Sequence, residues 1–270
     1  MLARMIFFIL VLLSARPELS ASEAAAFPYR LDAATDATLL SVGCAAAGVS
    51  LYLYSIRPVP GWLETIRAQK DNLSEWDRPA VGRHLTGASE ASDALTVAAS
   101  VTPLLLTIPY LQKRENMHAL TLAVMYAEVM IFVQAANGMS KALVNRKRPY
   151  LYVNNLFERK PRDGFSSSSF YSLHASLAFG SMVFLSTAVC DLFKSELRYL
   201  VLAGALPVAA LAGYFRFAAG LHFPTDIIAG ALIGTIIGYL IPAMHKFRSD
   251  AVTISFFSGR MTGIQAGMRF

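Results

Sequence analysis

Charged residues are scarce in this chain of 270 residues. Lysine, arginine, aspartate and glutamate together make up 16% of it, whereas a soluble domain carries roughly a quarter. Hydrophobic residues make up 55%. This balance excludes an ordinary soluble domain and indicates an integral membrane protein.

Acidic residues are fewer than basic ones, 18 against 24, which gives a formal net charge of +6. Such an excess is also found in nucleic-acid-binding proteins. Here, however, the basic residues lie mostly between apolar stretches, where positive charges set membrane topology or bind anionic head groups. We therefore expect no nucleic-acid partner.

Cysteine is nearly absent. Cys44 and Cys190 both lie within apolar stretches, and neither belongs to a Cys-x-x-Cys pair or a Cys/His cluster with metal-binding spacing. The sequence therefore predicts neither a disulfide framework nor a structural zinc site.

Long apolar runs are abundant. Six stretches of spanning or near-spanning length occupy about 36–55, 91–111, 117–139, 173–191, 197–215 and 224–244. Helices are the economical way to carry this much backbone through hydrocarbon. Gly230, Gly234 and Gly238 form overlapping small-xxx-small spacings that favour close helix packing. We predict an all-α, integral membrane bundle of six helices.

The two ends of the chain differ from this core. Arg4, the apolar run 6–13 and small residues at 20–22 predict a signal peptide over 1–22, with an uncleaved anchor or interfacial helix as the alternative. Residues 23–90 are expected to form the first membrane helix and an interfacial cap, and 91–246 the catalytic helical core. In the tail, 247–270, partial alternation over 252–257 and 264–270 indicates a short β-hairpin.

Three polar segments border the apolar stretches. Lys141-x6-Arg148 follows the third stretch, Ser172-Leu173-His174 begins the fourth, and Arg216-x5-His222-x3-Asp226 joins the fifth to the sixth. Because the fourth and fifth helices run out and back, all three segments are expected at the same end of the bundle. Ionisable residues at a membrane edge often mark a functional site.

Two histidines, a carboxylate and several cations suit phosphoryl transfer. One histidine attacks, the other protonates the leaving oxygen, and the cations neutralise the phosphoryl oxygens. We expect Pro224 to begin the last helix, so that Asp226 reaches back to His222, the predicted nucleophile. His174, at a helix N-terminus, is the predicted general acid.

Each residue also has a structural interpretation when it is taken alone. Lys141 can snorkel to the interface, the basic residues 146–148 can serve as a topology signal, and Ser172 can be a helix N-cap. Their joint occurrence favours a site. The other histidines, His84, His118 and His245, have no comparable neighbours in the sequence and are expected to be structural.

Together the three segments resemble the type 2 phosphatidic acid phosphatase superfamily (PAP2), membrane lipid phosphatases whose active site is shared with vanadium haloperoxidases. The resemblance covers about 85–244 and implies that His222 forms a phosphohistidine, with Asp226 as its partner and His174 as the proton donor. It also implies that no metal or cofactor takes part in catalysis, and that four residues bind the phosphate: Lys141, Arg148, Ser172 and Arg216.

The chain departs from the family pattern at Tyr171, Leu173 and Phe215, where the family has proline, glycine and serine. These departures motivate two alternatives, an inactive lipid-binding protein and a phosphotransferase that uses the same site. A haloperoxidase is disfavoured because it would be soluble. Family relatives and the charges of the short connections favour the inner membrane of a bacterium with a periplasmic site, although a cleaved signal peptide before six spans would place the site in the cytoplasm.

Overall fold

The computed structural model describes residues 27–57, 72–153, 164–193, 197–247, 252–257 and 263–268. The predicted signal peptide, 1–22, lies outside these ranges. Among the described residues, six helical segments are long and apolar enough to cross a membrane, which confirms the all-α six-helix prediction. They are α2 (Ala33–Ile56), α4 (Ala88–Val101) continued by η3 (Thr102–Thr107) and α5 (Ile108–Gln112), α6 (Asn116–Val144), α7 (Leu173–Leu192), α8 (Leu197–Ala218) and α9 (Pro224–Phe247).

The second of these segments is not a single regular helix. Pro103 and Pro109 lie at the start of η3 and of α5. Proline has no backbone N–H and clashes with the preceding turn, so it interrupts the regular hydrogen-bond ladder of a helix. The segment therefore crosses the bundle as α-helix, 3-10 helix and α-helix in series.

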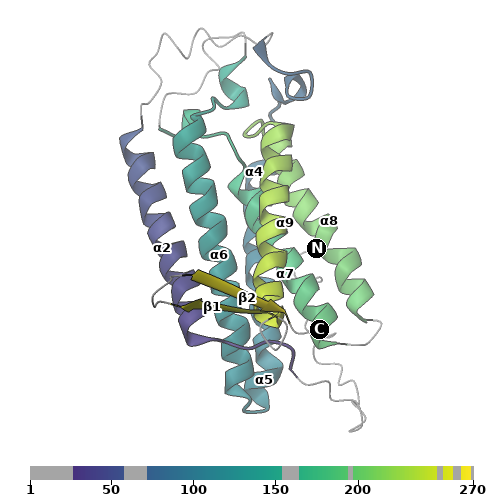
Figure 1. Cartoon of the computed structure of the whole chain (residues 1–270). Coiled ribbons are helices and arrows are strands. Elements are labelled where there is room, and N and C mark those ends of the chain that lie inside the picture. The colour runs from purple at the N-terminus through teal and green to yellow at the C-terminus, as the bar shows by residue number, and fades with distance from the viewer. Residues whose placement is uncertain are drawn as a thin grey trace.

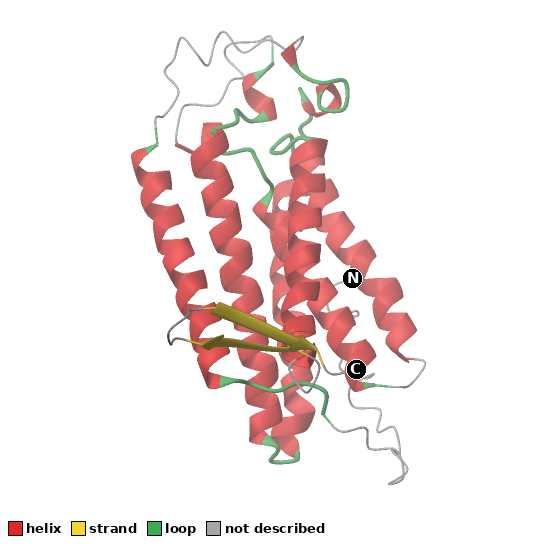
Figure 2. Ribbon diagram, viewed as in Figure 1, coloured by secondary structure: helices red, strands yellow, loops and turns green. Residues whose placement is uncertain are grey.

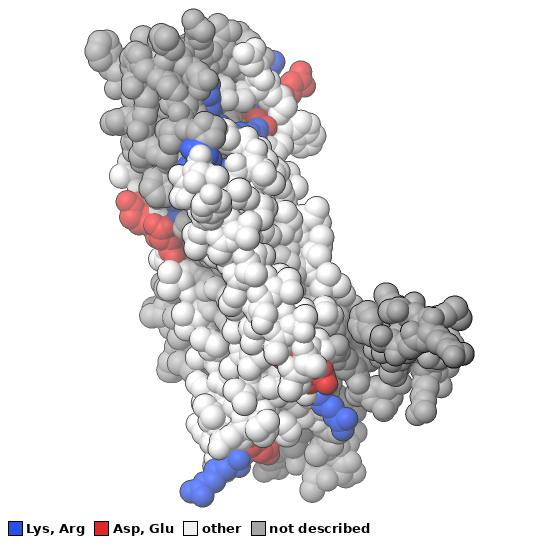
Figure 3. Space-filling view, turned by 60° about the vertical axis from the view of Figure 1, so that its left-hand side comes forward, with Lys and Arg blue, Asp and Glu red and all other residues white. Residues whose placement is uncertain are grey.

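The helices form an elongated bundle with α7 in its interior (Figure 1). Helix α7 packs against α4, α6, α8 and α9, and its side chain Phe184 joins Met125 and Val129 of α6 in the core. Large apolar side chains such as Leu51 and Leu232 remain exposed on the outside. Figure 3 shows charged side chains near the two ends of one face and an uncharged band between them. This distribution suits a bundle surrounded by lipid.

Short turns and loops gather at one end of the bundle (Figure 2). They include the 3-10 helices η2 (Arg78–Ala80), η4 (Pro149–Leu151) and η5 (Gly164–Ser167). This is also the end at which α6 and α8 finish and α7 and α9 begin. The helix ends therefore place the three polar segments together, as the sequence predicts.

The predicted C-terminal hairpin is present. Strands β1 (Val252–Phe257) and β2 (Gly263–Met268) pair antiparallel, with Val252 opposite Met268. Each strand pairs with the other in a two-stranded sheet.

Helices α7 and α9 approach closely because glycine lines their contact. A Cβ at Gly234 would lie 2.9 Å from the Gly180 backbone nitrogen and would overlap the Ser176 carbonyl oxygen. A Cβ at Gly238 would overlap the Gly180 carbonyl oxygen. Since apolar burial drives little association between helices in lipid, close backbone packing is a main source of their stability. The small-xxx-small prediction is confirmed.

Replacing Gly234 with valine should therefore separate α7 from α9. We expect a loss of at least about 2 kcal/mol in the free energy of unfolding, the scale of overpacking in a close-packed interior. Thermal unfolding in detergent measures the effect. Gly204→Ala is the matched control, because among the described residues nothing beyond its own stretch of helix lies within 4 Å of the added Cβ and alanine favours a helix. Equal melting temperatures for the two variants would contradict this account of the packing.

Candidate active site

The connection from α8 to α9 fixes the positions of Arg216 and His222. Helix α8 ends in a tight turn in which the Leu221 amide donates to the Arg216 carbonyl over 3.0 Å. Gly220 adopts φ +68°, and a Cβ there would overlap the Arg83 carbonyl oxygen, so glycine is required on both grounds. Four residues after Gly220, Pro224 begins α9, as predicted.

The imidazole of His222 is buried and has one defined tautomer. Its Nδ1 lies 2.8 Å from the Ser169 carbonyl oxygen, which only accepts hydrogen bonds, so Nδ1 carries the hydrogen. Asp226 Oδ2 lies 3.6 Å from the same nitrogen. Burial lowers the pKa of His222 to about 3, although the Asp226 carboxylate acts in the opposite direction. At neutral pH, Nε2 therefore carries a lone pair, as a nucleophile requires.

Three hydrogen-bond donors hold the Asp226 carboxylate. Its Oδ2 accepts from the Ser169 hydroxyl at 2.5 Å and from the Phe223 amide at 2.9 Å. The second contact is half of a capping box, in which the third helical residue reaches back to the N-cap amide. Its Oδ1 accepts from Arg146 Nη1 at 2.5 Å. The carboxylate orients His222 mainly through this framework and through its charge.

Arg146 connects two buried carboxylates. Helix α6 ends at Val144, and its C-cap Asn145 turns the chain with a left-handed φ of +47°, so that Arg146 faces the start of α9. Arg146 Nη2 donates to Asp77 Oδ2 at 2.6 Å. Arg146 Nη1 donates to Asp226 Oδ1 and to Thr225 Oγ1. Asp77 also accepts from the Thr225 amide at 3.2 Å, so it stabilises the positive end of α9. The sequence pattern predicts only a topology signal for Arg146. Its contacts with two buried carboxylates give it a further, structural role.

A second cluster surrounds His174 in the first turn of α7. Asp93 Oδ1 lies 2.8 Å from His174 Nε2 and also accepts a hydrogen bond from Arg216 Nη2. Arg216 Nη2 in turn contacts His174 Nε2, and its Nε donates to Ser92 Oγ at 3.0 Å. Asp93 thus positions both predicted residues. The three predicted polar segments do not include Asp93.

Lys141 and Arg148 lie within electrostatic range of both predicted histidines, His174 and His222. Arg148 Nη1 donates to the Leu221 carbonyl at 3.2 Å, next to His222. The three predicted segments therefore meet at one end of the bundle.

Ser172 is the N-cap of α7. Its hydroxyl oxygen accepts from the Ala175 amide at 3.4 Å, and its own amide donates to the Asp226 carbonyl at 3.1 Å. The structural interpretation of this serine is therefore confirmed. Its predicted contact with phosphate remains a prediction, for which the hydroxyl hydrogen is the available donor.

The substitution at Leu173 does not strain the backbone. Leu173 is the first residue of α7, and in the described part of the chain only Arg114 and Asn145 are non-glycine residues with positive φ. Position 173 therefore does not need the conformational freedom of glycine. Tyr171 is buried, and its carbonyl accepts from Asn137 Nδ2 at 2.8 Å.

Two acidic residues outside the three predicted segments carry a signal in the sequence. Asp93 and Glu128 are acidic residues inside predicted spanning stretches, and an ionisable residue in that position is a candidate functional residue by default. Asp77 offers no comparable signal, because it lies outside the predicted spanning stretches, and its partners Arg146 and Thr225 are far away in the sequence. His245, which the sequence predicts to be structural, lies beside the buried carboxylates Asp36 and Glu128. Within the described ranges, these three side chains form the one group suited to a metal ion.

Replacing Arg146 with glutamine should destabilise the fold. Removing one partner of a buried ion pair leaves an uncompensated charge and costs about 3 kcal/mol or more. Arg146→Lys should recover part of the loss, since a single ammonium group cannot reproduce the separate contacts of Nη1 and Nη2. Thermal unfolding in detergent checks this, with the exposed Lys113→Gln as control. A melting temperature equal to that of the control would exclude a structural role for Arg146.

Comparison with known proteins places these segments in one family. The model of the PAP2 superfamily matches residues 119–250, which include all three predicted segments. An undecaprenyl-diphosphatase of Sulfolobus acidocaldarius is 30% identical over 142 residues, covering 52% of this chain and 59% of the relative. A lipid A 4'-phosphatase of Bacteroides thetaiotaomicron is 31% identical over 152 residues, covering 54% and 62%. The chain thus spans about three fifths of the length of these relatives.

Among solved structures, a transmembrane PAP2-type phosphatidylglycerolphosphate phosphatase from Bacillus subtilis aligns with a TM-score of 0.46 and 16% identity, over 92% of this chain and 97% of that one. The family model and the two relatives overlap the residues that form the site. Residues 119–250, which hold the three segments of the candidate site, match the PAP2 superfamily.

Proposed function

We propose that this protein is a membrane lipid phosphatase that hydrolyses a lipid phosphomonoester or pyrophosphate through a phosphohistidine intermediate. The observation that supports it best is the state of His222. The Ser169 carbonyl holds the hydrogen on Nδ1, which leaves the Nε2 lone pair for attack. Arg148 and Lys141 supply positive charge beside it.

In the first step, His222 Nε2 attacks phosphorus and forms a P–N bond. The bond between phosphorus and the leaving oxygen breaks, and His174 donates its proton to that oxygen. The imidazole of His222 becomes positively charged, and the Asp226 carboxylate 3.6 Å from Nδ1 stabilises that charge. Asp93 Oδ1, 2.8 Å from His174 Nε2, orients the imidazole of this acid.

In the second step, water attacks the phosphorus of the phosphohistidine. The P–N bond breaks, inorganic phosphate leaves, and His174 accepts the proton of the attacking water, which restores both histidines. Lys141, Arg148 and Arg216 neutralise the phosphoryl oxygens in both transition states, and the Ser172 hydroxyl adds a hydrogen bond. A phosphotransferase would replace the water by another acceptor and use the same groups.

The position of the site supports a lipid substrate. The site residues lie at the ends of spanning helices, where lipid head groups are found. The two similar relatives are named for undecaprenyl diphosphate and lipid A. Candidate substrates are these two, phosphatidic acid and phosphatidylglycerol phosphate.

We place the protein in a bacterial inner membrane with the site facing the periplasm. Lys113, Arg114, Arg198 and Lys246 lie at the opposite end of the spans and would then be cytoplasmic, as the positive-inside rule favours. Because α2 is itself a candidate span, its first residue would also be cytoplasmic.

Phosphate release from a panel of lipid phosphates tests the proposal. With EDTA present, the parent should release phosphate from at least one lipid of the panel. His222→Ala should reduce kcat by about a thousand-fold or more, because no nucleophile replaces the imidazole. His174→Ala should reduce kcat by about a hundred-fold or more. The reduction should be smaller with a lipid whose leaving group needs no proton.

His118→Ala serves as the control histidine, since its exposed ring pairs with Glu115. Its activity should equal that of the parent. If the parent releases no more phosphate than His222→Ala on every lipid, the chain is an inactive lipid-binding protein and the proposal fails. Transfer of phosphate to a second lipid instead of water would identify a phosphotransferase.

A further inference from the structure

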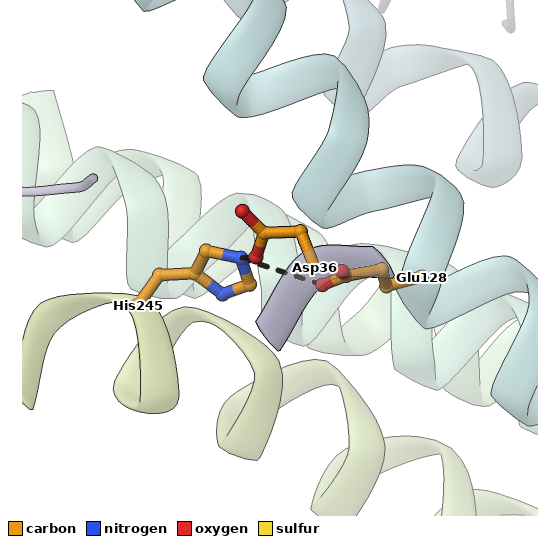
Figure 4. A group of neighbouring side chains, drawn as sticks. All are labelled: Asp36, Glu128 and His245. Atoms are coloured by element: carbon orange, nitrogen blue, oxygen red, sulfur yellow. Dashed lines mark hydrogen bonds and ion pairs between the residues drawn. The ribbon is translucent and has the colours of Figure 1, made fainter. Parts of the chain in front are cut away.

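A buried polar cluster lies far from the site described above. Asp36 of α2, Glu128 of α6 and His245 of α9 point toward one another (Figure 4). All three are buried, with relative exposures of 7%, 0% and 2%. Residue Tyr54, at the other end of α2, contacts Ser168 beside His222. At 1.5 Å per residue, Asp36 lies about 27 Å along the helix from that contact.

The imidazole of His245 faces the two carboxylates with its lone pair. Its Nδ1 lies 2.9 Å from the Ile241 carbonyl, which only accepts, so Nδ1 carries the hydrogen of the neutral ring. Nε2 then points at Asp36 Oδ1, 3.0 Å away, and Glu128 Oε2, 3.4 Å away. A histidine that ligates a metal usually donates its other N–H to a backbone carbonyl or a carboxylate in this manner.

The distances and charges match a divalent cation. Ligand atoms about 2.1 Å from a tetrahedral Zn²⁺ lie about 3.4 Å from one another. The ligand atoms of the three residues all lie within 4.8 Å of each other. Two carboxylates, a neutral imidazole and one divalent ion add up to zero charge, whereas an imidazolium alone would leave one negative charge buried in a spanning bundle.

One carboxylate oxygen gives independent support for a ligand. Asp36 Oδ2 is buried and has no hydrogen-bond partner among the described residues. A buried carboxylate oxygen without a partner costs free energy, and a metal ion would satisfy it by bidentate binding or through a bound water.

A cation here would also hold α2 to the bundle. The buried residues of α2 are Asp36, Gly43 and Ser50, one stripe without a large apolar side chain. Gly43 meets Ile131 of α6, and Ser50 meets Gly138. Since apolar burial contributes little between helices in lipid, polar contacts matter more for attachment. Asp36 is the ionisable member of this stripe.

We propose that Asp36, Glu128 and His245 bind a divalent transition-metal ion, Zn²⁺ in the first instance, which clamps α2 to α6 and α9. His245 and the carboxylates supply three ligands, and water completes the coordination. The ion is structural, since it lies far from the proposed phosphatase site. The inference therefore stands or falls separately from the proposed function.

Metal content and stability test this inference on the full chain, purified in detergent without a polyhistidine tag. The chelated protein is supplied with Zn²⁺, desalted and analysed by inductively coupled plasma mass spectrometry. We expect about one Zn²⁺ per chain and a higher melting temperature than in the chelated form, with no such increase from Mg²⁺. Glu128→Gln and His245→Gln should each lower the retained Zn²⁺ by at least ten-fold.

His118→Gln is the control, because this exposed histidine also pairs with a carboxylate; it should retain Zn²⁺ fully. X-ray absorption of the Zn²⁺-loaded parent should show one imidazole nitrogen among oxygen ligands, a readout that does not depend on whether a variant folds. No retained Zn²⁺ in the parent would overturn the inference. So would full retention in the Glu128 and His245 variants, or binding that is lost in His118→Gln.

Discussion

A single buried carboxylate, that of Asp226, organises the end of the bundle where the candidate site lies. It cannot remain charged in that position without compensation, and the compensation comes from Arg146, the Ser169 hydroxyl and the Phe223 amide. These contacts tie the connection after α6, the loop that holds Ser169 and the start of α9 into one unit. His222 owes its orientation to the same unit, because the Ser169 carbonyl that accepts from its ring belongs to the residue whose hydroxyl holds Asp226.

The membrane explains why the chemistry is confined to the ends of the bundle. Along the spans, packing depends on small residues, as where Gly234 and Gly238 of α9 meet α7. At the ends, water and head groups allow charge, and the helix termini that meet there provide amide donors. The Asp36–Glu128–His245 cluster departs from this rule, since it buries two carboxylates among spanning helices. Its position at the attachment of α2 suits a role in holding that helix.

Sequence patterns predicted the six spans, the start of α9 at Pro224 and the meeting of the three polar segments, since length, proline position and helix parity are local or countable properties. They did not predict the pairing of Arg146 with Asp77, or of Asp93 with Arg216, because these partners lie 69 and 123 residues apart. A basic run between spans serves equally well for topology and for binding. Only the fold shows that Arg146 turns toward buried carboxylates.

The central claim is that His222 is the nucleophile, and trapping the covalent intermediate tests it most directly. The parent is mixed with a lipid substrate carrying a radiolabelled terminal phosphate, quenched in alkali within milliseconds and digested. We expect an alkali-stable, acid-labile label on the peptide that contains His222, and none in His222→Ala. Phosphate release by the parent without any label on His222, or with the label on another residue, would contradict the account.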